Sequence, residues 1–283
     1  MINMRINNNI GANNTQRQVG INNKAVANKL EKLSSGKRVN RSSDDPAGLA
    51  ISEKMRSQII GSLTASRNTQ DAVSLIQVAE GGLQGIHDML QRSRELAVQS
   101  ASGTNDDNVD RAAMQNEFEN IVAEIDDTAS KTEYNGMKVL DGSTGTIPIQ
   151  AGPNSDDVTN ISINAMTAEQ LLGLGSSQYD ASTDANVASG AAASAAIDTV
   201  DSAINDVSMQ RAELGALQNR LEFRMQALDI QAENATAAES RIRDSDMAKM
   251  MTELTTKSIL QKASTAMLAQ ANARPQGVLK LLG

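Results

Sequence analysis

The sequence predicts a mainly α-helical protein: an elongated antiparallel helical bundle or coiled coil, formed by paired N- and C-terminal segments, with a small β-hairpin region. The first reason is composition, because the 283 residues include two Tyr, two Phe and no Trp. Ala, Leu, Ile, Val and Met must then supply the buried surface, which suits helices packed along a narrow apolar seam. The second reason is that apolar residues recur three and four positions apart over two long segments, as in amphipathic helices.

Three helices are predicted in the first half of the chain. The longest runs from about residue 46 to 100 and keeps one alternating frame of apolar positions. Polar residues interrupt this frame, so its seam is weak as a lone two-stranded coil. The apolar positions are Val19, Val26, Leu30 and Leu33 in the first helix; Met55, Ile59, Val73, Ile76, Leu83 and Leu90 in the second; and Met114, Phe118, Ile121 and Ile125 in the third. The polar positions on the second frame are Ser62, Ser66, Thr69, Glu80 and His87.

The middle of the chain changes character and predicts a β-hairpin region at about residues 140–175. Residues 146–164 alternate apolar and polar side chains around a Gly-Pro-Asn turn, which is the pattern of a small hairpin. Asn135-Gly136, shortly before it, is a turn signal. Residues 173–192 are rich in Gly, Ser, Ala and Asp and therefore predict a loop or short linker.

The last third of the chain mirrors the first. From Ile197 the helical frame returns as a second very long helix, a polar break follows at residues 239–246, and an amphipathic segment ends the chain. The apolar positions are Val200, Ile204, Val207, Leu214, Leu221, Met225, Leu228 and Ile242 in the long helix, and Met247, Met251, Leu254, Ile259, Met267 and Leu268 in the last segment. This mirrored order predicts that the first helix lies beside the last, and the two long helices beside each other.

Charge is distributed unevenly along the chain. Residues 1–42 hold eight Lys or Arg and one acidic residue, and residues 241–283 hold seven basic and three acidic residues, although the net charge is −8. The basic ends lack interleaved aromatic residues, so no nucleic acid partner is expected. Neither end has enough apolar residues to fold alone, as in polymer subunits whose ends become ordered on association. We therefore expect residues 1–42 and 241–283 to form a terminal helical inner-core domain, and residues 43–240 to form a long-helix bundle domain.

The chain has no Cys, which excludes disulfides and thiolate metal sites. Its start, MINMRINNNIGANN, lacks the apolar core and cleavage site of a signal peptide. No apolar run of about 18 residues predicts membrane insertion. The expectation is a protein that is cytoplasmic or is exported by a route that needs no cleavable signal.

No catalytic, cofactor-binding or metal-binding residue is predicted, so the chain is not expected to be an enzyme. His87 is the only histidine, which argues against nucleophilic triads and His-rich zinc sites, and its place on the seam favours a packing role. The Asp pairs at 44–45, 106–107, 126–127 and 156–157 lack calcium-loop spacing and mostly adjoin breaks, where capping is the simpler role. The sequence SSGKR lacks the other residues of a phosphate-binding loop.

The stretch LSSGKRVNRSSDDPAGLAIS, residues 33–52, interrupts the helices. Asp45 is predicted to cap the following helix, and Pro46 suits its first position, where no backbone donor is needed. Gly36 and Asn40 let the chain turn, so the segment is interpreted as a spoke between an inner and an outer helical layer. An ordinary helix-loop-helix connection is the alternative interpretation.

This stretch closely resembles the N-terminal signature of bacterial flagellins. The segments SRNTQDAVSLIQVAEGGL, LQRSRELAVQSA, YNGMKVLDG, ESRIRDSDMAKMMTEL and MLAQANARPQGVLKLLG also resemble that family, at both ends and in the family's order. The resemblance implies a structural subunit that is secreted by type III export and self-assembles into the extracellular bacterial flagellar filament for swimming motility. A hook-filament junction protein and a non-polymerising secreted coiled-coil scaffold are the alternatives.

The resemblance also implies a set of partners and no cofactor. These are other copies of the chain in a homopolymer, a flagellar export chaperone that holds the C-terminal segment, and hook-associated and cap proteins. It further implies that the monomer activates the host Toll-like receptor that senses flagellin, through Gln91, Arg92, Leu96 and Glu117. Arg92 and Leu96 are four residues apart on one predicted helix face, where they offer a forked donor beside an apolar anchor. Glu117 must pack alongside from another helix.

Overall fold

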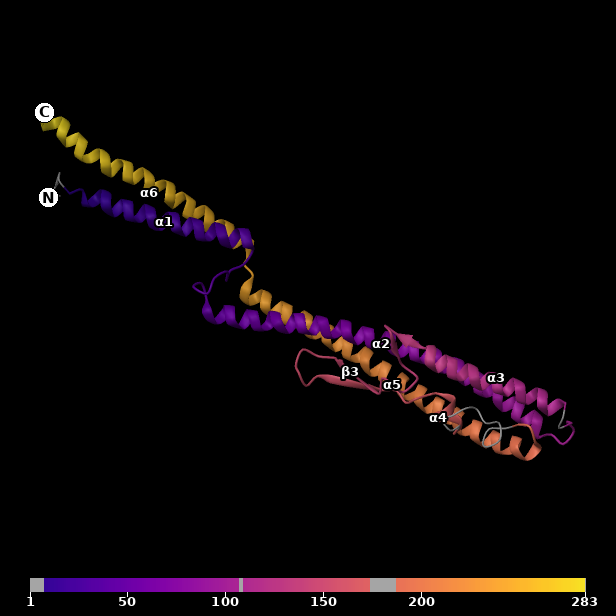
Figure 1. Ribbon diagram of the computed structural model, residues 1–283. Coiled ribbons are helices and arrows are strands. Elements are labelled where there is room, and N and C mark those ends of the chain that lie inside the picture. The colour runs from indigo at the N-terminus through magenta and orange to yellow at the C-terminus, as the bar shows by residue number, and fades with distance from the viewer. Residues whose placement is uncertain (1–7, 107–108, 174–186, 283) are drawn as a thin grey trace. The chain divides into compact units, whose positions relative to one another are not determined.

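The computed structural model describes residues 8–106, 109–173 and 187–282, which form mostly long helices (Figure 1). The helices are α1 (Ile10–Ser35), α2 (Pro46–Ala101), α3 (Asp110–Lys131), α4 (Ala168–Leu172), α5 (Gly190–Arg243) and α6 (Met247–Leu282). The strands are β1 (Glu133–Tyr134), β2 (Met137–Lys138), β3 (Thr146–Gln150) and β4 (Val158–Ser162). The predicted mainly helical fold with a small β-hairpin region is confirmed, and the short helix α4 is an addition to it.

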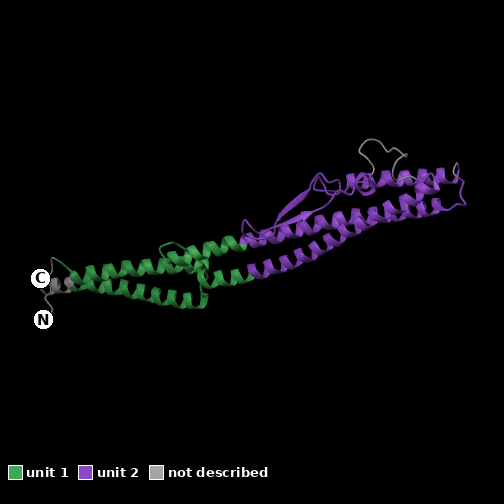
Figure 2. Cartoon of the chain, turned by 90° about the horizontal axis from the view of Figure 1, so that it is seen from below, with its two compact units in different colours: residues 1–59, 233–283 green, residues 60–232 purple. Residues whose placement is uncertain are grey.

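The chain divides into two compact units, which Figure 2 separates by colour. Unit 1 consists of residues 1–59 and 233–283, and unit 2 of residues 60–232. Both α2 and α5 contribute residues to each unit. Unit 1 therefore contains α1 and α6, and unit 2 contains both hairpins and the larger part of α2 and of α5.

Local capping interactions fix both boundaries of α1 and the start of α6. Asn9 Oδ1 accepts a hydrogen bond from Ala12 N at 3.0 Å at the start of α1, and Gly36, with φ of 69°, ends that helix in the left-handed conformation. At the start of α6, Asp246 Oδ1 accepts from Ala248 N at 2.9 Å. Gly36 and Asp246 lie in the two segments that the sequence predicts as breaks, residues 33–52 and 239–246, whereas the cap at Asn9 was not predicted.

Two predicted boundaries of α5 were wrong by several residues. The helix begins at Gly190 rather than Ile197, because the Ala-rich run after Gly190 favours helix even without large apolar residues. It continues to Arg243, so the predicted break at 239–246 narrows to residues 244–246. Of the predicted linker, residues 174–186 lie outside the described part of the chain.

In unit 2, α2, α3 and α5 share one hydrophobic core. The long helices α2 and α5 run antiparallel, because Ser66 Oγ donates to Asp229 Oδ1 at 3.0 Å while Arg94 Nε donates to Asp201 Oδ1 at 2.5 Å. This confirms the predicted pairing of the two long helices. The largest fully buried side chains of the three helices are Ile76, Leu83, Ile86, Leu90, Leu96, Phe118, Ile125, Gln210, Leu214 and Leu221.

The two hairpins occur where the sequence predicts turns. Asn135 and Gly136, with φ of 51° and 77°, join β1 to β2 in a turn whose two central residues both need positive φ. β3 pairs antiparallel with β4, from Thr146 opposite Ser162 to Gln150 opposite Val158. The turn after β3 closely approaches α2 at Gly61, where an added Cβ would lie 2.9 Å from Pro153 Cβ. Only glycine permits this approach.

In unit 1, α1 and α6 lie side by side, which confirms the predicted pairing of the first and last helices (Figure 1). Polar side chains provide many of the contacts between them. Asn22 Nδ2 donates to Ser264 Oγ at 2.6 Å, and Lys29 forms an ion pair with Glu253. The pairing of the chain ends therefore depends on hydrogen bonds and ion pairs as well as on an apolar seam.

Candidate self-assembly surface

More than half of the large apolar side chains that the structure describes on the paired helices α1 and α6 are exposed. Among the large apolar residues that the structure describes in unit 1, only Val19, Val39 and Met250 are buried. Large apolar side chains that remain exposed on α1 and α6 are Ile10, Ile21, Leu30, Met247, Met251, Ile259, Leu260 and Met267. A soluble monomer rarely presents so many apolar side chains on two neighbouring helices unless another surface covers them. We call this set the terminal apolar surface.

The two breaks in the helices of unit 1 are joined by backbone hydrogen bonds. Arg38 N donates to Arg243 O at 2.7 Å, and Ser245 N donates to Gly36 O at 3.0 Å. Arg243 Nη1 also pairs with Glu53 Oε1 at 2.6 Å. The break after α1 and the break before α6 thus form one connected structure. This link was not predictable from the sequence, because hydrogen bonds between two irregular segments leave no periodic signal.

The acidic residues before α2 hold the segment predicted to act as a spoke. Asp44 pairs with Lys32 Nζ at 2.9 Å and accepts hydrogen bonds from the backbone N–H groups of Asn40 and Arg41. The hydrogen bond from Lys32 is the main cause that lowers the pKa of Asp44 from its ordinary 3.8 to about 2. Glu31 accepts from Arg41 Nε at 2.9 Å and adds a second link across the turn.

The structure places Asp45 and Pro46 at the start of α2. Asp45 Oδ1 accepts a hydrogen bond from Gly48 N at 2.9 Å, and Pro46 is the first residue of the helix. A side-chain oxygen bonded to the third backbone N–H is the geometry of an N-cap, and Pro at the first position leaves no donor unsatisfied. The beginning of the 56-residue helix is therefore fixed by these two side chains.

The candidate receptor residues lie in unit 2, on α2 and α3. Arg92 Nη2 pairs with Glu117 Oε1 at 2.7 Å and Arg92 Nη1 with Glu95 Oε2 at 2.9 Å, and the pairing with Glu117 is the main cause that raises the pKa of Arg92. Gln91 is exposed and its Nε2 lies 2.8 Å from His87 Nε2. The structure therefore brings Arg92 and Glu117 together in an accessible region, and it leaves Gln91, the preceding residue of α2, exposed as well.

Leu96 does not belong to that accessible region, which corrects the expectation of an apolar anchor on the surface. Its side chain is 1% exposed and packs in the core of unit 2. Residues four apart on a helix differ by about 40° in direction, and here that rotation separates the exposed Arg92 from the buried Leu96. Leu96 supports the helix from inside instead of offering a contact.

The remaining candidate chemistry has structural roles. Asp126 Oδ1 accepts a hydrogen bond from Ala168 N, at the start of α4, at 2.6 Å, and Asp157 Oδ2 accepts one from Asn154 N, in the turn between β3 and β4, at 3.2 Å. Within the described ranges, no three His, Cys, Asp or Glu side chains approach closely enough to hold a metal ion. No helix among the same residues is both long and apolar enough to cross a bilayer.

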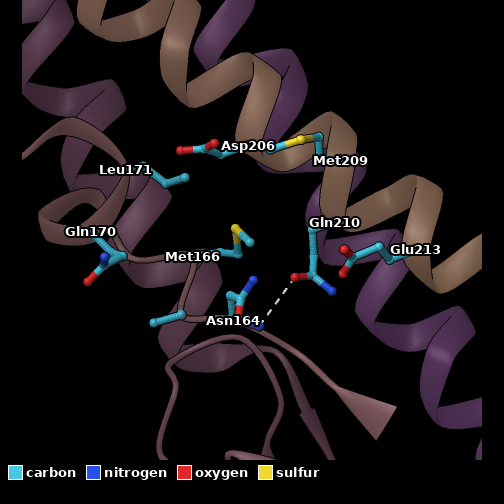
Figure 3. A pocket seen from close by; sticks show the side chains of 9 residues that line it. Asn164, Met166, Gln170, Leu171, Asp206, Met209, Gln210 and Glu213 are labelled. Carbon is cyan, nitrogen blue, oxygen red and sulfur yellow. Dashed lines mark hydrogen bonds between the residues drawn. The ribbon is translucent and has the colours of Figure 1, made fainter.

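A cavity of about 270 Å³ lies between α5 and the segment that follows β4 (Figure 3). Gln210 extends from α5 into it, accepts a hydrogen bond from Asn164 N at 3.3 Å and donates to Ser162 O at 3.3 Å. Met166 lies in the middle of the view, while Asp206 and Glu213 extend from α5 at the rim. The buried amide of Gln210 therefore attaches the hairpin to α5.

Comparison with known proteins identifies the family. Residues 6–145 match the bacterial flagellin N-terminal helical region, and residues 197–282 match the C-terminal helical region. The chain is 48% identical over 279 residues to a flagellin of Halalkalibacterium halodurans, which covers 99% of this chain and all of the relative. It is 46% identical over 289 residues to a 31.3 kDa flagellar filament core protein of Treponema maltophilum, and the match covers 99% of this chain and all of the relative. The crystal structure of Bacillus cereus flagellin matches with a TM-score of 0.48 and 32% identity, over 61% of this chain and 94% of that one. The chain belongs to the bacterial flagellin family.

Proposed function

We propose that this protein is the structural subunit of an extracellular bacterial flagellar filament and that it polymerises with copies of itself. The observation that carries this proposal is the terminal apolar surface on α1 and α6. Covering it requires neighbouring protein, and a homopolymer supplies that cover at every position along the filament. Family membership and the filament proteins among the relatives support the same conclusion.

Within the filament, residues 1–42 and 241–283 form the inner-core domain, and residues 43–240 form the surrounding bundle domain. The concentration of exposed apolar side chains in the terminal helices supports placing those helices where subunits contact each other on most sides. The protein acts by assembly and movement rather than by catalysis, so it is not an enzyme.

The direct test is seeded elongation. Purified monomer is added to sheared filament seeds, and the filament length is measured by electron microscopy. Long filaments are expected from the wild type, and Ile259→Asp is expected to prevent elongation because it places a charge in the terminal apolar surface while leaving the monomer helical. A chain that never elongates on seeds is a non-polymerising scaffold. A hook-filament junction protein would instead be scarce in sheared surface material.

The other partners follow from the same role. A flagellar export chaperone covers the C-terminal segment before type III export, and hook-associated and cap proteins contact the two ends of the filament. Binding of a chaperone to α6 is supported by three exposed methionine side chains, Met247, Met251 and Met267, because flexible methionine side chains adapt to more than one partner. Filament yield from cells that lack the chaperone would test this role.

The dissociated monomer also activates the host Toll-like receptor that senses flagellin, through Gln91, Arg92 and Glu117. Exposure of all three side chains and the ion pair between Arg92 and Glu117 support the proposal. Arg92→Ala is expected to lower signalling in reporter cells by about tenfold or more, as for an interface hot spot. Arg94→Ala is the matched control, because Arg94 is an equally exposed arginine that pairs with Asp201 instead. Equal signalling by wild type and Arg92→Ala would remove this claim.

A further inference from the structure

A second row of apolar side chains runs along α5 and is exposed. Met209, Ala216, Phe223 and Ile230 recur every seven residues, and Phe223 is 70% exposed. The buried residues Val207, Leu214, Leu221 and Leu228 precede them by two positions each. Two residues correspond to about 200° around a helix, so the exposed row faces away from the core. We call Met209, Ala216, Phe223 and Ile230 the outer row.

The spacing of the outer row identifies the kind of surface that fits on it. A strict seven-residue recurrence keeps apolar side chains in line with a second helix that crosses at a shallow angle. Isolated apolar side chains at irregular positions would carry no such information. The partner element is therefore a helix of comparable length.

A matching surface lies on α2. Val78, Gly81, Gly85 and Asp88 are three, four and three residues apart and so share one helix face. An added Cβ on Gly81 or Gly85 would meet no atom within 4 Å, in contrast to Gly82, where it would meet Leu140 Cδ1 at 2.7 Å. Packing within the described chain explains Gly82 but not the other two glycines. Gly81 and Gly85 leave a shallow depression that accepts a large side chain from another helix.

We propose that the outer row of α5 in one copy packs antiparallel on the Gly81–Gly85 face of α2 in the next copy. When Phe223 lies opposite Gly85, Ile230 lies opposite Val78. Ala227 then lies opposite Gly81, because both faces follow the same spacing of three and four residues. This inference rests on the proposed function, since it requires that copies of the chain assemble.

Charge complementarity supports this register. The same alignment places Arg220 opposite Asp88, and both residues are exposed. Within one chain, α2 and α5 are antiparallel and Ser66 bonds to Asp229. Arg220 precedes Asp229 by nine residues, so it lies beside about residue 75 of α2. That position is roughly 20 Å along the helix from Asp88. The two charges therefore meet only between copies. Neighbouring copies are then displaced from each other by roughly 20 Å along the helices.

The contact is of the type that produces a filament. The outer row and the Gly81–Gly85 face belong to different helices of the same subunit, so each copy uses one surface toward one neighbour and the other surface toward another. Contacts between two different surfaces repeat without closing unless their rotation forms a ring. An antiparallel contact between α5 and α2 of different copies also keeps all subunits in the same direction, because α2 and α5 are antiparallel within each chain.

The first experiment measures the critical concentration for elongation on wild-type filament seeds. Phe223→Ala is expected to raise it by about tenfold or more, as when a central aromatic anchor is removed from an interface. Gly85→Leu is expected to raise it similarly by filling the depression, although its monomer should melt no lower than the wild type because leucine favours helix over glycine. The control is Val98→Ala, an exposed apolar position on another side of α2, which should stay within about twofold.

The second experiment tests the register by exchanging charges. Arg220→Asp and Asp88→Arg should each weaken elongation, and the double variant should recover most of the loss. If wild type elongates and Phe223→Ala and Gly85→Leu match it, this inference is wrong and the filament function stands. Single charge variants that weaken elongation without recovery in the double variant would also overturn the proposed register. Failure of the wild type to elongate would overturn the filament function and this inference together.

Discussion

Units 1 and 2 are both built from long helices with apolar residues three and four positions apart, yet they bury those residues to very different extents. Unit 2 has a continuous core to which α2, α3, α5 and the hairpins contribute. In unit 1 the described helices α1 and α6 expose Leu30 and Ile259 by 57% and 61% and rely on polar links such as Asn22 with Ser264. The comparison teaches that helical periodicity predicts where a seam lies but not whether the same chain covers it. Unit 2 covers its own seam, whereas unit 1 leaves much of its seam exposed, and this exposed part is what we propose neighbouring copies cover.

The largest expected effect comes from removing one of the paired ends. Deletion of residues 1–42 or of residues 241–283 should abolish polymerisation, because either deletion removes one helix of the α1–α6 pair and leaves the other without its partner. The segment 43–240 should remain largely helical, since the core of unit 2 is kept. Sedimentation and circular dichroism measure the two quantities. Long polymers from either truncated chain would show that the terminal helices are dispensable.

Two alanine substitutions, one in each unit, should differ in how much they lower the free energy of unfolding. Phe118→Ala should lower the free energy of unfolding of the monomer by about 3–5 kcal/mol, because Phe118 is fully buried in unit 2. Ile259→Ala should change it by less than about 0.5 kcal/mol, because that side chain is mostly exposed in unit 1. Denaturant unfolding of monomers below the polymerisation concentration provides the measurement. Equal losses for the two variants would mean that unit 1 has a core of its own.

The N-cap of α2 should make a smaller contribution. Asp45→Ala removes the acceptor of Gly48 N and should cost about 0.5–2 kcal/mol. Asp45→Asn is the control, because asparagine caps helices about as well as aspartate. Thermal unfolding followed by circular dichroism compares the three proteins. If the Asp45→Ala variant and the wild type unfold at the same temperature, Asp45 does not cap α2.

The smallest expected effect is a pH dependence of the unfolding free energy, which arises from Asp44 in unit 1. The folded pKa of Asp44, about 2, lies below its ordinary 3.8, so its contribution to stability is complete above about pH 4 and is lost as the pH falls toward 2. Solvent around the ion pair with Lys32 limits this contribution to about 1 kcal/mol. The difference in unfolding free energy between wild type and Asp44→Asn should therefore shrink between pH 4 and 2. A difference that stays constant over this range would exclude the pairing as its source.

Most of the fold was predictable from the sequence, because periodicity, turn residues and capping residues act locally. The frame of Ile76, Leu83 and Leu90 and the Asn135-Gly136 turn carry their own signals. What could not be predicted depends on contacts between distant segments. Leu96 is buried in a core that several segments of unit 2 share, and the link from Arg38 to Arg243 joins two irregular segments. The exposure expected of Gln91, Arg92 and Glu117 is therefore confirmed, the surface anchor expected at Leu96 was wrong, and the receptor role itself stays a prediction.

Asn22 has a consequence for the accuracy with which each new subunit joins. Asn22 is only 6% exposed, and its Nδ2 donates to Ser264 Oγ of α6 at 2.6 Å. Apolar side chains tolerate a slip of α1 along α6, since one methyl group can replace another, but a slipped pair would leave this amide without an acceptor. This amide, together with the other polar links between α1 and α6, therefore favours one alignment of the two helices, and we expect misaligned chains to be disfavoured as the structure grows.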